Sequence, residues 1–358
     1  MATPIQTREI NEDKMHQFLG KVVEDFGASL SSSLAYIGQK LGLYKTLATD
    51  GPLTPAELAH KTNTNERYVR EWLVNQAAGG YVEYDATAGR YSLNPEQAIA
   101  LTDEQSPFYV GGGFFVIKAM TQAVEKIEEH FREGGGMLWG EHHPDLFIGT
   151  ERFFRPGYAA HLVSSWIPSL EGVDEKLKAG GKVADVGCGH GASTIIMAQA
   201  YPNSEFWAFD NHSASIDYAR RAAEQAGAGN RVHFEVASAQ TIPDNQYDLV
   251  AFFDCLHDMG DPVGACRRAA EVLATGGTLL IVEPMAGNTV DENFNPIGRT
   301  FAGASTLCCT SNSLALNGPA LGAVASEDAI REVVLAGGFK QFRRATETPF
   351  NRIFEARK

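Results

Sequence analysis

The chain has 358 residues, of which 44% are apolar, and a formal net charge of −14. This length exceeds the usual size of a single domain, so we expect at least two domains and one large core. The negative charge argues against nucleic acid or an anionic membrane as a partner, because both are normally bound by clusters of Lys and Arg.

The N-terminal segment, residues 1–18, is polar and lacks the apolar core of a secretion signal. No stretch of the sequence reaches the ~20 apolar residues that a membrane-spanning helix needs. The five cysteines form no C-x-x-C motif, which indicates free thiols in a reducing compartment. We therefore expect a cytosolic protein.

Residues 1–105 have the pattern of a winged helix. Apolar positions follow a helical period over residues 15–26 and again over residues 30–41. Thr54-Pro55-Ala56-Glu57 is a capping box that predicts a short helix through His60, and Thr64 is the expected cap of the next helix. That helix should end at Gly79-Gly80. Two short runs, residues 81–84 and 90–93, then predict a hairpin.

A winged helix raises the alternative of a DNA-binding regulator. Residues 1–100 contain nine Lys and Arg against twelve Asp and Glu, a net charge of −3. In the would-be recognition helix, Arg67 and Arg70 alternate with Glu66 and Glu71, which weakens the field that phosphate contacts need. We prefer a domain that mediates dimerisation and covers the substrate.

Residues 106–170 form a bridge between the two domains. Glycine triplets at 111–113 and 134–136 flank a predicted helical stretch, residues 114–131, and favour a lid at this place. Of the adjacent His142 and His143, His143 is our candidate for a substrate contact, and a surface loop is the alternative. No further ligand lies at metal-binding spacing nearby, so we expect no metal.

Residues 171–358 alternate strands with helices or loops, which predicts an α/β domain with a seven-stranded Rossmann-like sheet. The first five strands should be parallel because crossover segments separate them. The last two are joined by only five residues and must therefore be antiparallel. The predicted strands are residues 182–186, 205–210, 232–236, 247–253, 278–283, 339–345 and 351–356.

A glycine loop follows the first of these strands. Gly187, Gly189 and Gly191 lie where the strand ends and a helix begins, so that backbone N–H groups can face an anion. Asp185 ends the strand, and Asp210 ends the next strand at the position that binds ribose hydroxyls in related sheets. The G-x-G-x-G spacing is shorter than the G-x-G-x-x-G of nicotinamide dehydrogenases, which disfavours a pyrophosphate ligand.

Four segments resemble the successive motifs of class I S-adenosylmethionine-dependent methyltransferases: VADVGCGHG, FWAFD, YDLVAFFDCLHDMGDP and GGTLLIVEP. With the winged helix in front, the chain is similar to bacterial small-molecule methyltransferases, and particularly to a subgroup with ERFFRPGY (residues 151–158) and ATETPFN (residues 345–351). The resemblance implies S-adenosyl-L-methionine as the cofactor, a small-molecule methyl acceptor and a homodimer.

The resemblance also implies roles for individual residues. Gly187, Gly189 and Gly191 would hold the methionine end of the cofactor, and Asp185 would meet its ammonium directly or through water. The expected ribose contact is Asp210, the adenine edge would meet Ala237 and Ser238, and Asp254 would help to fix the cofactor.

His257 coincides with the catalytic base of the similar plant-type O-methyltransferases, and a histidine suits the removal of a proton from a hydroxyl. This favours O-methylation. The alternative is that His257 bonds to the backbone or lines the cofactor. A second function class also stays open, a winged-helix regulator or sensor that uses S-adenosylmethionine or another metabolite as its ligand.

Residues 284–325 are an insertion far longer than an ordinary loop, which indicates a cap over the site. Arg299 is its only cation and could meet an acidic substrate or form a surface salt bridge. Cys308 and Cys309 are expected to be buried, and no basic residue close in sequence would lower the pKa of either thiol.

Overall fold

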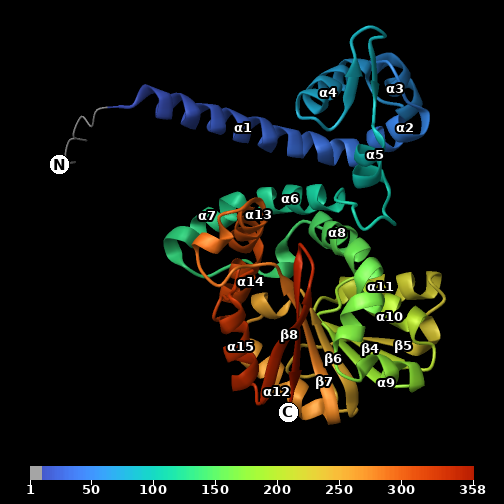
Figure 1. Cartoon of the computed structure of the whole chain (residues 1–358), viewed down its shortest axis with the longest axis vertical. Helices are drawn as coiled ribbons and strands as arrows, with labels where there is room; N and C mark the ends of the chain where they lie inside the picture. Colours follow the sequence, from blue (N-terminus) through green and yellow to red (C-terminus); the bar gives the residue numbers. More distant parts are fainter. Residues whose placement is uncertain (1–9) are drawn as a thin grey trace. The chain divides into compact units, whose positions relative to one another are not determined.

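The computed structural model describes residues 10–358, which fold into two compact units (Figure 1). One unit contains the described residues up to Asp103 together with Tyr109–Phe114, and the other contains Glu104–Phe108 together with Phe115–Lys358. The division into segments 1–105, 106–170 and 171–358 stays a prediction. Residues 1–9 of the polar N-terminal segment lie outside the described residues.

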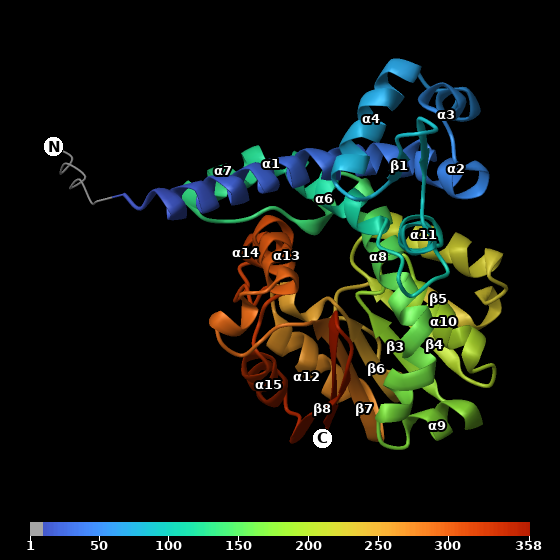
Figure 2. The same ribbon diagram turned by 45° about the horizontal axis from the view of Figure 1, so that its top comes forward.

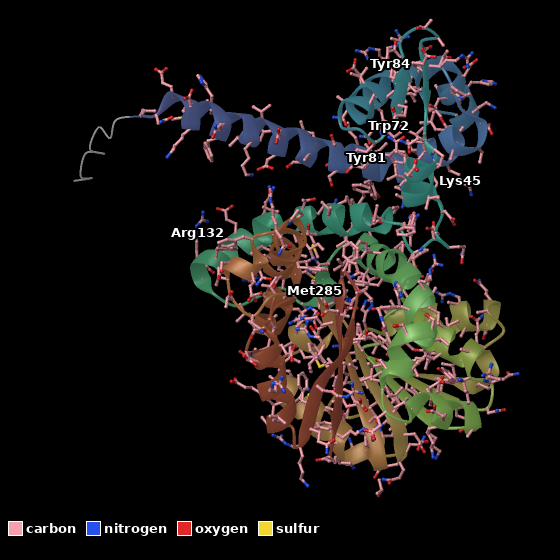
Figure 3. All side chains as sticks on the ribbon, viewed as in Figure 1. Lys45, Trp72, Tyr81, Tyr84, Arg132 and Met285 are labelled. Carbon is pink, nitrogen blue, oxygen red and sulfur yellow. The ribbon has the colours of Figure 1, made fainter. Side chains whose placement is uncertain are left out.

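The first unit has the predicted winged-helix order. The two apolar stripes belong to a single helix of 29 residues. Trp72, labelled in Figure 3, packs in the core with its ring 4.9 Å from that of Tyr44 and donates to the Leu34 carbonyl. The elements are α1 (Glu12–Lys40), α2 (Leu43–Asp50), α3 (Pro55–Thr62), α4 (Glu66–Ala78), β1 (Glu83–Asp85), β2 (Arg90–Ser92) and α5 (Pro95–Thr102).

Of the two predicted helix caps, one is confirmed and the other is wrong. The capping box of α3 is formed, because Glu57 N–H donates to Thr54 Oγ1 while the Glu57 carboxylate accepts from Thr54 N–H. The prediction that Thr64 caps α4 is wrong. Asn65 is the cap, since its side chain accepts from the Arg67 N–H, and the Thr64 hydroxyl is bonded to that of Thr62.

The helix predicted over residues 114–131 is two helices, α6 (Gly112–Gln122) and α7 (Val124–Glu133), separated at Ala123. The two pack into different apolar clusters. Met120 of α6 lies with Leu146 and Phe301, whereas Ile127 of α7 lies with Met137. Periodicity within the sequence does not show that the two halves have different partners.

The sheet of the second unit has seven strands in the order β5-β4-β3-β6-β7-β9-β8. Strands β3 to β7 are parallel, and β9 runs antiparallel to both β7 and β8, as predicted. Four predicted strands match in their bounds, while the fifth is longer. The strands are β3 (Lys182–Val186), β4 (Glu205–Asp210), β5 (Val232–Val236), β6 (Tyr247–Phe253), β7 (Leu273–Pro284), β8 (Gln341–Glu347) and β9 (Asn351–Arg357).

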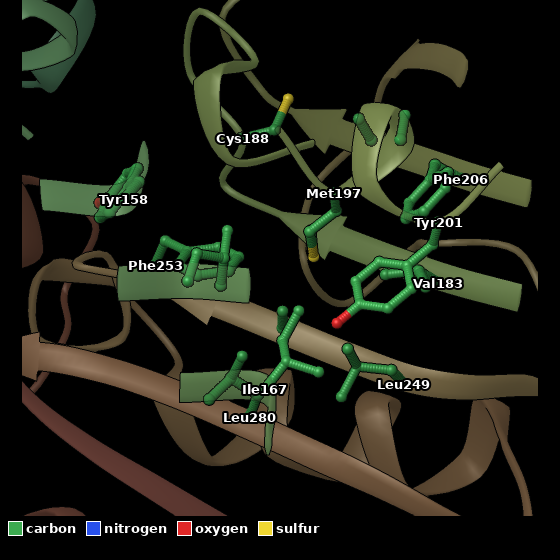
Figure 4. Packing of buried hydrophobic residues seen from close by; sticks show 14 of the residues in the cluster. Tyr158, Ile167, Val183, Cys188, Met197, Tyr201, Phe206, Leu249, Phe253 and Leu280 are labelled. Atoms are coloured by element: carbon green, nitrogen blue, oxygen red, sulfur yellow. The ribbon is translucent and has the colours of Figure 1, made fainter. Parts of the chain in front are cut away.

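Helices cover both faces of this sheet (Figures 1 and 2). Alternate residues of each strand point to opposite faces, so Val183 packs in one core and Ala184 in the other. Figure 4 shows the first core, in which Tyr158 lies near Phe253. The helices are α8 (Asp145–His161), α9 (Val173–Ala179), α10 (Ala192–Ala200) and α11 (Ser213–Gln225) on that face, and α12 (Pro262–Val272) and α15 (Glu327–Ala336) on the other.

The insertion after β7 holds two further helices, α13 (Pro296–Ala304) and α14 (Thr310–Ala315), joined by a π-helical turn over Ser305–Cys309. In the described part of the chain, no helix combines the length and the apolar character that crossing a membrane would require.

Candidate active site

The glycine loop lies between β3 and α10, and all three of its glycines have a positive φ: 78° at Gly187, 52° at Gly189 and 80° at Gly191. A Cβ at Gly187 would lie 2.7 Å from Cys255 Sγ, and one at Gly191 would lie 2.9 Å from the Phe234 ring. At Gly189 a Cβ would meet nothing within 4 Å, because this residue faces open space. The loop therefore needs glycine for its conformation and for close packing on both sides.

A cavity opens above this loop at the carboxyl edge of the sheet, the edge where open α/β sheets bind their ligands. It is bounded by the glycine loop, by the segments that follow β4, β5 and β6, and by side chains of α8 and α14. Six of the predicted site residues line it together: Gly187, Gly189, Asp210, Ala237, Ser238 and Asp254.

Asp210 connects the end of β4 to the glycine loop. Its Oδ2 accepts from the Gly189 N–H at 2.9 Å and its Oδ1 from the His212 N–H at 2.8 Å. Burial raises the pKa of this carboxyl group, and the two backbone donors oppose the rise. Each carboxylate oxygen can accept a second hydrogen bond, so Asp210 can hold two donors of a ligand in the cavity.

Asp254 follows β6 with a φ of 50°, an uncommon conformation for a residue with a side chain. Its Oδ2 accepts from the Tyr158 hydroxyl at 2.7 Å and its Oδ1 from the Asn351 amide at 2.8 Å. Burial raises the pKa of Asp254 to about 7. The carboxylate is therefore fixed from both sides while it borders the cavity.

Asp185 does not line the cavity, and its expected contact with a ligand, directly or through water, stays a prediction. The side chain is fully buried, and its Oδ2 accepts from the hydroxyls of Ser193 and Thr194, each at 2.6 Å. Its Oδ1 has no partner in the structure, and burial raises the pKa of the group to about 6. Asp185 thus ties the end of β3 to the start of α10 and supports the loop from beneath.

His257 is also absent from the cavity wall, although Cys255, Asp258 and Met259 beside it line the cavity. The ring is buried, with Nδ1 2.6 Å from the Glu283 carboxylate. Burial favours the neutral ring, but the Glu283 carboxylate and the Cys309 thiol outweigh it and raise the pKa of His257 well above its ordinary value.

A base must be neutral and must reach the proton that it removes. In this geometry the ring is enclosed and lies against Glu283, which favours a supporting role, and the base role of His257 stays a prediction. Glu283, a residue of β7, holds the His257 ring in this position through its contact with Nδ1.

The paired thiols of the insertion are buried, as expected, but they have a basic neighbour after all. His257 reaches Cys309 from the loop after β6. The hydrogen bond with Cys308 and the charge of His257 lower the pKa of Cys309 to about 5 against the effect of burial. The neighbour is distant in sequence, which is why a search near Cys308 and Cys309 did not find it.

The two predicted substrate contacts lie elsewhere. His143 is half-exposed and its Nδ1 accepts from the Asp145 N–H at 3.1 Å, so it belongs to a surface group beside Lys118 rather than to the cavity. Arg299 lines a second, open hollow formed within the insertion together with Val290 and Phe294. Neither residue lines the cavity above the glycine loop, and both assignments stay predictions.

Sequence reasoning assigned no role to Tyr158 and Asn351, which hold Asp254. Both were within reach of a sequence signal, because Tyr158 ends the ERFFRPGY string and Asn351 ends the ATETPFN string. The structure brings the ends of these two strings to one carboxylate. Asp258, Glu151 and the rings of Trp139, Phe147 and Phe154 are further lining residues that the sequence analysis did not single out.

Within residues 10–358, no cluster of three or more His, Cys, Asp or Glu side chains is arranged to hold a metal ion. The site offers backbone amides as hydrogen-bond donors and carboxylates as acceptors around a cavity, a set suited to an organic ligand with hydroxyl and amino groups.

Comparisons with known families agree with this geometry. Residues 177–319, which include the glycine loop and the segments after β4 to β6, match the model of a family described as "Methyltransferase domain". Residues 28–103 match an "Rv2258c-like winged HTH domain". A segment similar to methyltransferase domains thus follows a segment similar to a winged HTH domain.

Relatives with known names share the methyltransferase domain. The 27-O-demethylrifamycin SV methyltransferase of Amycolatopsis mediterranei is 34% identical over 131 residues, which are 34% of this chain and 48% of that protein. A trans-aconitate 2-methyltransferase of Streptomyces avermitilis is 28% identical over 128 residues, 36% of this chain and 48% of that protein. The match thus spans less than half the length of these curated relatives.

Solved structures share the whole fold. The mitomycin 7-O-methyltransferase superposes with a TM-score of 0.71 at 18% identity and covers 97% of this chain and 100% of that one. Human N-acetylserotonin methyltransferase, solved with S-adenosylmethionine, superposes with a TM-score of 0.70 at 17% identity and covers 100% of this chain and 99% of that one. These similarities confirm the predicted fold, with its winged helix and its seven-stranded methyltransferase sheet.

Proposed function

We propose that this protein transfers a methyl group from S-adenosyl-L-methionine to a small molecule, with an oxygen atom as the favoured acceptor. The observation that carries the proposal is the convergence of Gly187, Gly189, Asp210 and Asp254 on one cavity, within a segment that matches a methyltransferase domain. When bound, the cofactor supplies an electrophilic methyl group on its sulfonium.

The residues present fit this cofactor. The open space at Gly189 leaves room for the methionine end beside the backbone amides of the loop. The free lone pairs of Asp210 suit the two ribose hydroxyls, and Ala237 and Ser238 border the place for the adenine edge. Asp254, held by Tyr158 and Asn351, offers the cofactor a carboxyl group in a fixed position. Asp185 acts from beneath by fixing the loop.

The chemistry needs alignment more than acid or base groups. Methyl transfer is an in-line displacement, so the protein must place the acceptor atom opposite the leaving sulfur and exclude water. Aromatic side chains of α8 and of the preceding segment line the cavity and support both tasks. O-methylation is favoured by the similarity to the mitomycin 7-O-methyltransferase and to the 27-O-demethylrifamycin SV methyltransferase.

Calorimetric titration with S-adenosylhomocysteine tests the proposal. We expect binding by the native protein and a loss of affinity of at least about tenfold in Asp210→Ala, because two ribose hydrogen bonds disappear. The side chain of Asp217 is 61% exposed on α11, so Asp217→Ala is a matched control that should bind normally. Absence of binding to folded native protein would refute the proposal.

The regulator alternative draws on the match to a winged HTH domain. The geometry of α4 counts against it, because Arg67 is paired with Glu71 and Arg70 with Glu66 along the helix. These ion pairs occupy the cations that would contact phosphates. We therefore assign the winged helix to assembly and substrate enclosure, and not to nucleic acid.

We also propose a homodimer in the cytosol. The buried residues of α1 are Ser31, Ala35 and Gly38, all in its C-terminal third, whereas large apolar side chains along the rest of the helix are exposed. An unpaired apolar face of this length marks an interface in an assembled protein. The five free cysteines, all within the described residues, support a reducing compartment.

A further inference from the structure

The charges around the cavity restrict the kind of acceptor that it can take. We infer that the methyl acceptor is an uncharged or cationic molecule with a ring-bearing apolar body, and that Asp258 selects it by accepting a hydrogen bond from its hydroxyl or ammonium group. The inference rests on the proposed function and adds the acceptor's charge class to it.

Four carboxylates line the cavity, namely those of Glu151, Asp210, Asp254 and Asp258, and among its lining residues in the described chain there is no Lys or Arg. The one basic group in the wall is His190, and burial lowers its pKa to about 4, so that the ring is neutral. An acidic acceptor would therefore meet carboxyl groups and no Lys or Arg among the lining residues, which disfavours its negative charge.

Three of the four carboxylates are already engaged. Glu151 is paired with Arg155 at 2.7 Å, Asp210 accepts two backbone amides, and Asp254 accepts from Tyr158 and Asn351. Asp210 and Asp254 also belong to the cofactor's part of the site.

Asp258 differs from the other three. Its carboxylate has no hydrogen bond or ion pair to another described residue, yet it lines the cavity from the turn after β6. Burial raises its pKa to about 8, and the nearby charge of His257 only partly offsets this rise. A donor or a cation brought by a ligand would supply what this carboxylate lacks.

Aromatic side chains also line the cavity. The Trp139 and Phe147 rings meet edge to face at 5.8 Å, and Phe154 of α8 is a further lining ring. Flat faces of this kind pack against rings and also attract cations. The Asn312 side-chain amide donates to the backbone carbonyl of Asp258 and accepts, through Oδ1, from the backbone N–H of Trp139. One amide therefore connects the turn that carries Asp258 to the segment that carries the Trp139 ring.

Three fragments with one scaffold test the inference: 2-phenylethylamine, 2-phenylethanol and 3-phenylpropionate. Their binding to the protein saturated with S-adenosylhomocysteine is measured by ligand-observed NMR at about pH 9, where Asp258 is ionised. We expect the amine to bind most tightly, the alcohol next, and the carboxylate at least about tenfold more weakly than the amine.

Asp258→Asn should reduce the preference for amine over carboxylate at least about fivefold, with the affinity for S-adenosylhomocysteine unchanged. The matched control Asp328→Asn alters a carboxylate that is 76% exposed on α15 and should leave the preference intact. The melting temperature of each variant reports its folding.

A carboxylate fragment that binds as well as the amine would overturn the inference, as would a preference that survives Asp258→Asn or the failure of all three fragments to bind. Failure of S-adenosylhomocysteine itself to bind would instead count against the proposed function.

Discussion

Next to the turn that carries Asp258 lies a group of buried ionisable side chains: His257, Glu283, Arg352 and Cys309. Arg352 lies opposite Glu283 in the β7–β9 pairing and donates to the carbonyls of Pro284 and Ala325. A buried ion pair contributes little net stability, but removal of one partner leaves the other charge uncompensated. We therefore infer that His257 stabilises the packing beside the site by balancing the buried charge of Glu283.

This role predicts the effect of His257→Ala. The substitution should lower the free energy of unfolding by about 3–5 kcal/mol, because the fully buried Glu283 carboxylate loses the imidazolium. Urea unfolding measures the change, and His60→Ala, at an exposed position of α3, serves as the control. If the variant keeps its stability and binds S-adenosylhomocysteine normally but turns over slowly, the result would support a role of His257 as the base.

At the scale of elements, the site depends on how β3 passes into α10. The loop reverses its direction through residues with positive φ, and it is wedged between Cys255 on one side and Phe234 on the other. The hairpin of β8 and β9 completes the site from the far edge of the sheet, because its turn brings Asn351 to Asp254. A reversed last strand is thus a structural requirement of this pocket.

We predict opposite effects for two glycine-to-alanine substitutions, one in the glycine loop and one in α8. Gly191→Ala should lower stability by about 1–3 kcal/mol and weaken S-adenosylhomocysteine binding, since a Cβ there meets Phe234 and the φ is 80°. Gly157→Ala, within α8 and with nothing within 4 Å of the added Cβ, should raise stability by about 0.5–1 kcal/mol. Denaturant titrations compare the two, and equal effects would contradict this account of the loop.

At the scale of the whole molecule, α1 exposes large apolar side chains that a monomeric protein would normally bury. Phe18, Phe26 and Leu30 are 62%, 64% and 67% exposed on this helix. A single chain that leaves such a face in water loses the free energy that its burial would release. A second copy of the same helix offers a surface of the same kind, as expected of a twofold interface.

Light scattering coupled to gel filtration tests the dimer. We expect twice the chain mass of 38.8 kDa for the native protein and a monomer for the double variant Phe18→Ser, Phe26→Ser. Phe131→Ser removes an equally exposed ring from α7, where the side chain is 75% exposed, and should leave the dimer intact. A native protein that elutes as a monomer at tens of micromolar would disprove the assignment.

Several features of this protein follow from the sequence alone. The parallel strands β3, β4, β5 and β6 were predicted to their end residues, because buried strands between turns have a strong local pattern. The capping box at Thr54 and the glycine loop could be recognised in the same way, since backbone conformation at caps and glycines depends on neighbours in the chain.

Only the tertiary structure decided which polar groups face the cavity. Tyr158 and Asn351 lie 96 and 97 positions from the Asp254 that they hold, and Glu283 lies 26 positions from the His257 that it keeps buried. The direction of a side chain and its charge state depend on what distant segments place around it, and no local pattern encodes that. The fold could therefore be predicted from the sequence, whereas the roles of Asp185, His257 and Asp258 required their packed surroundings.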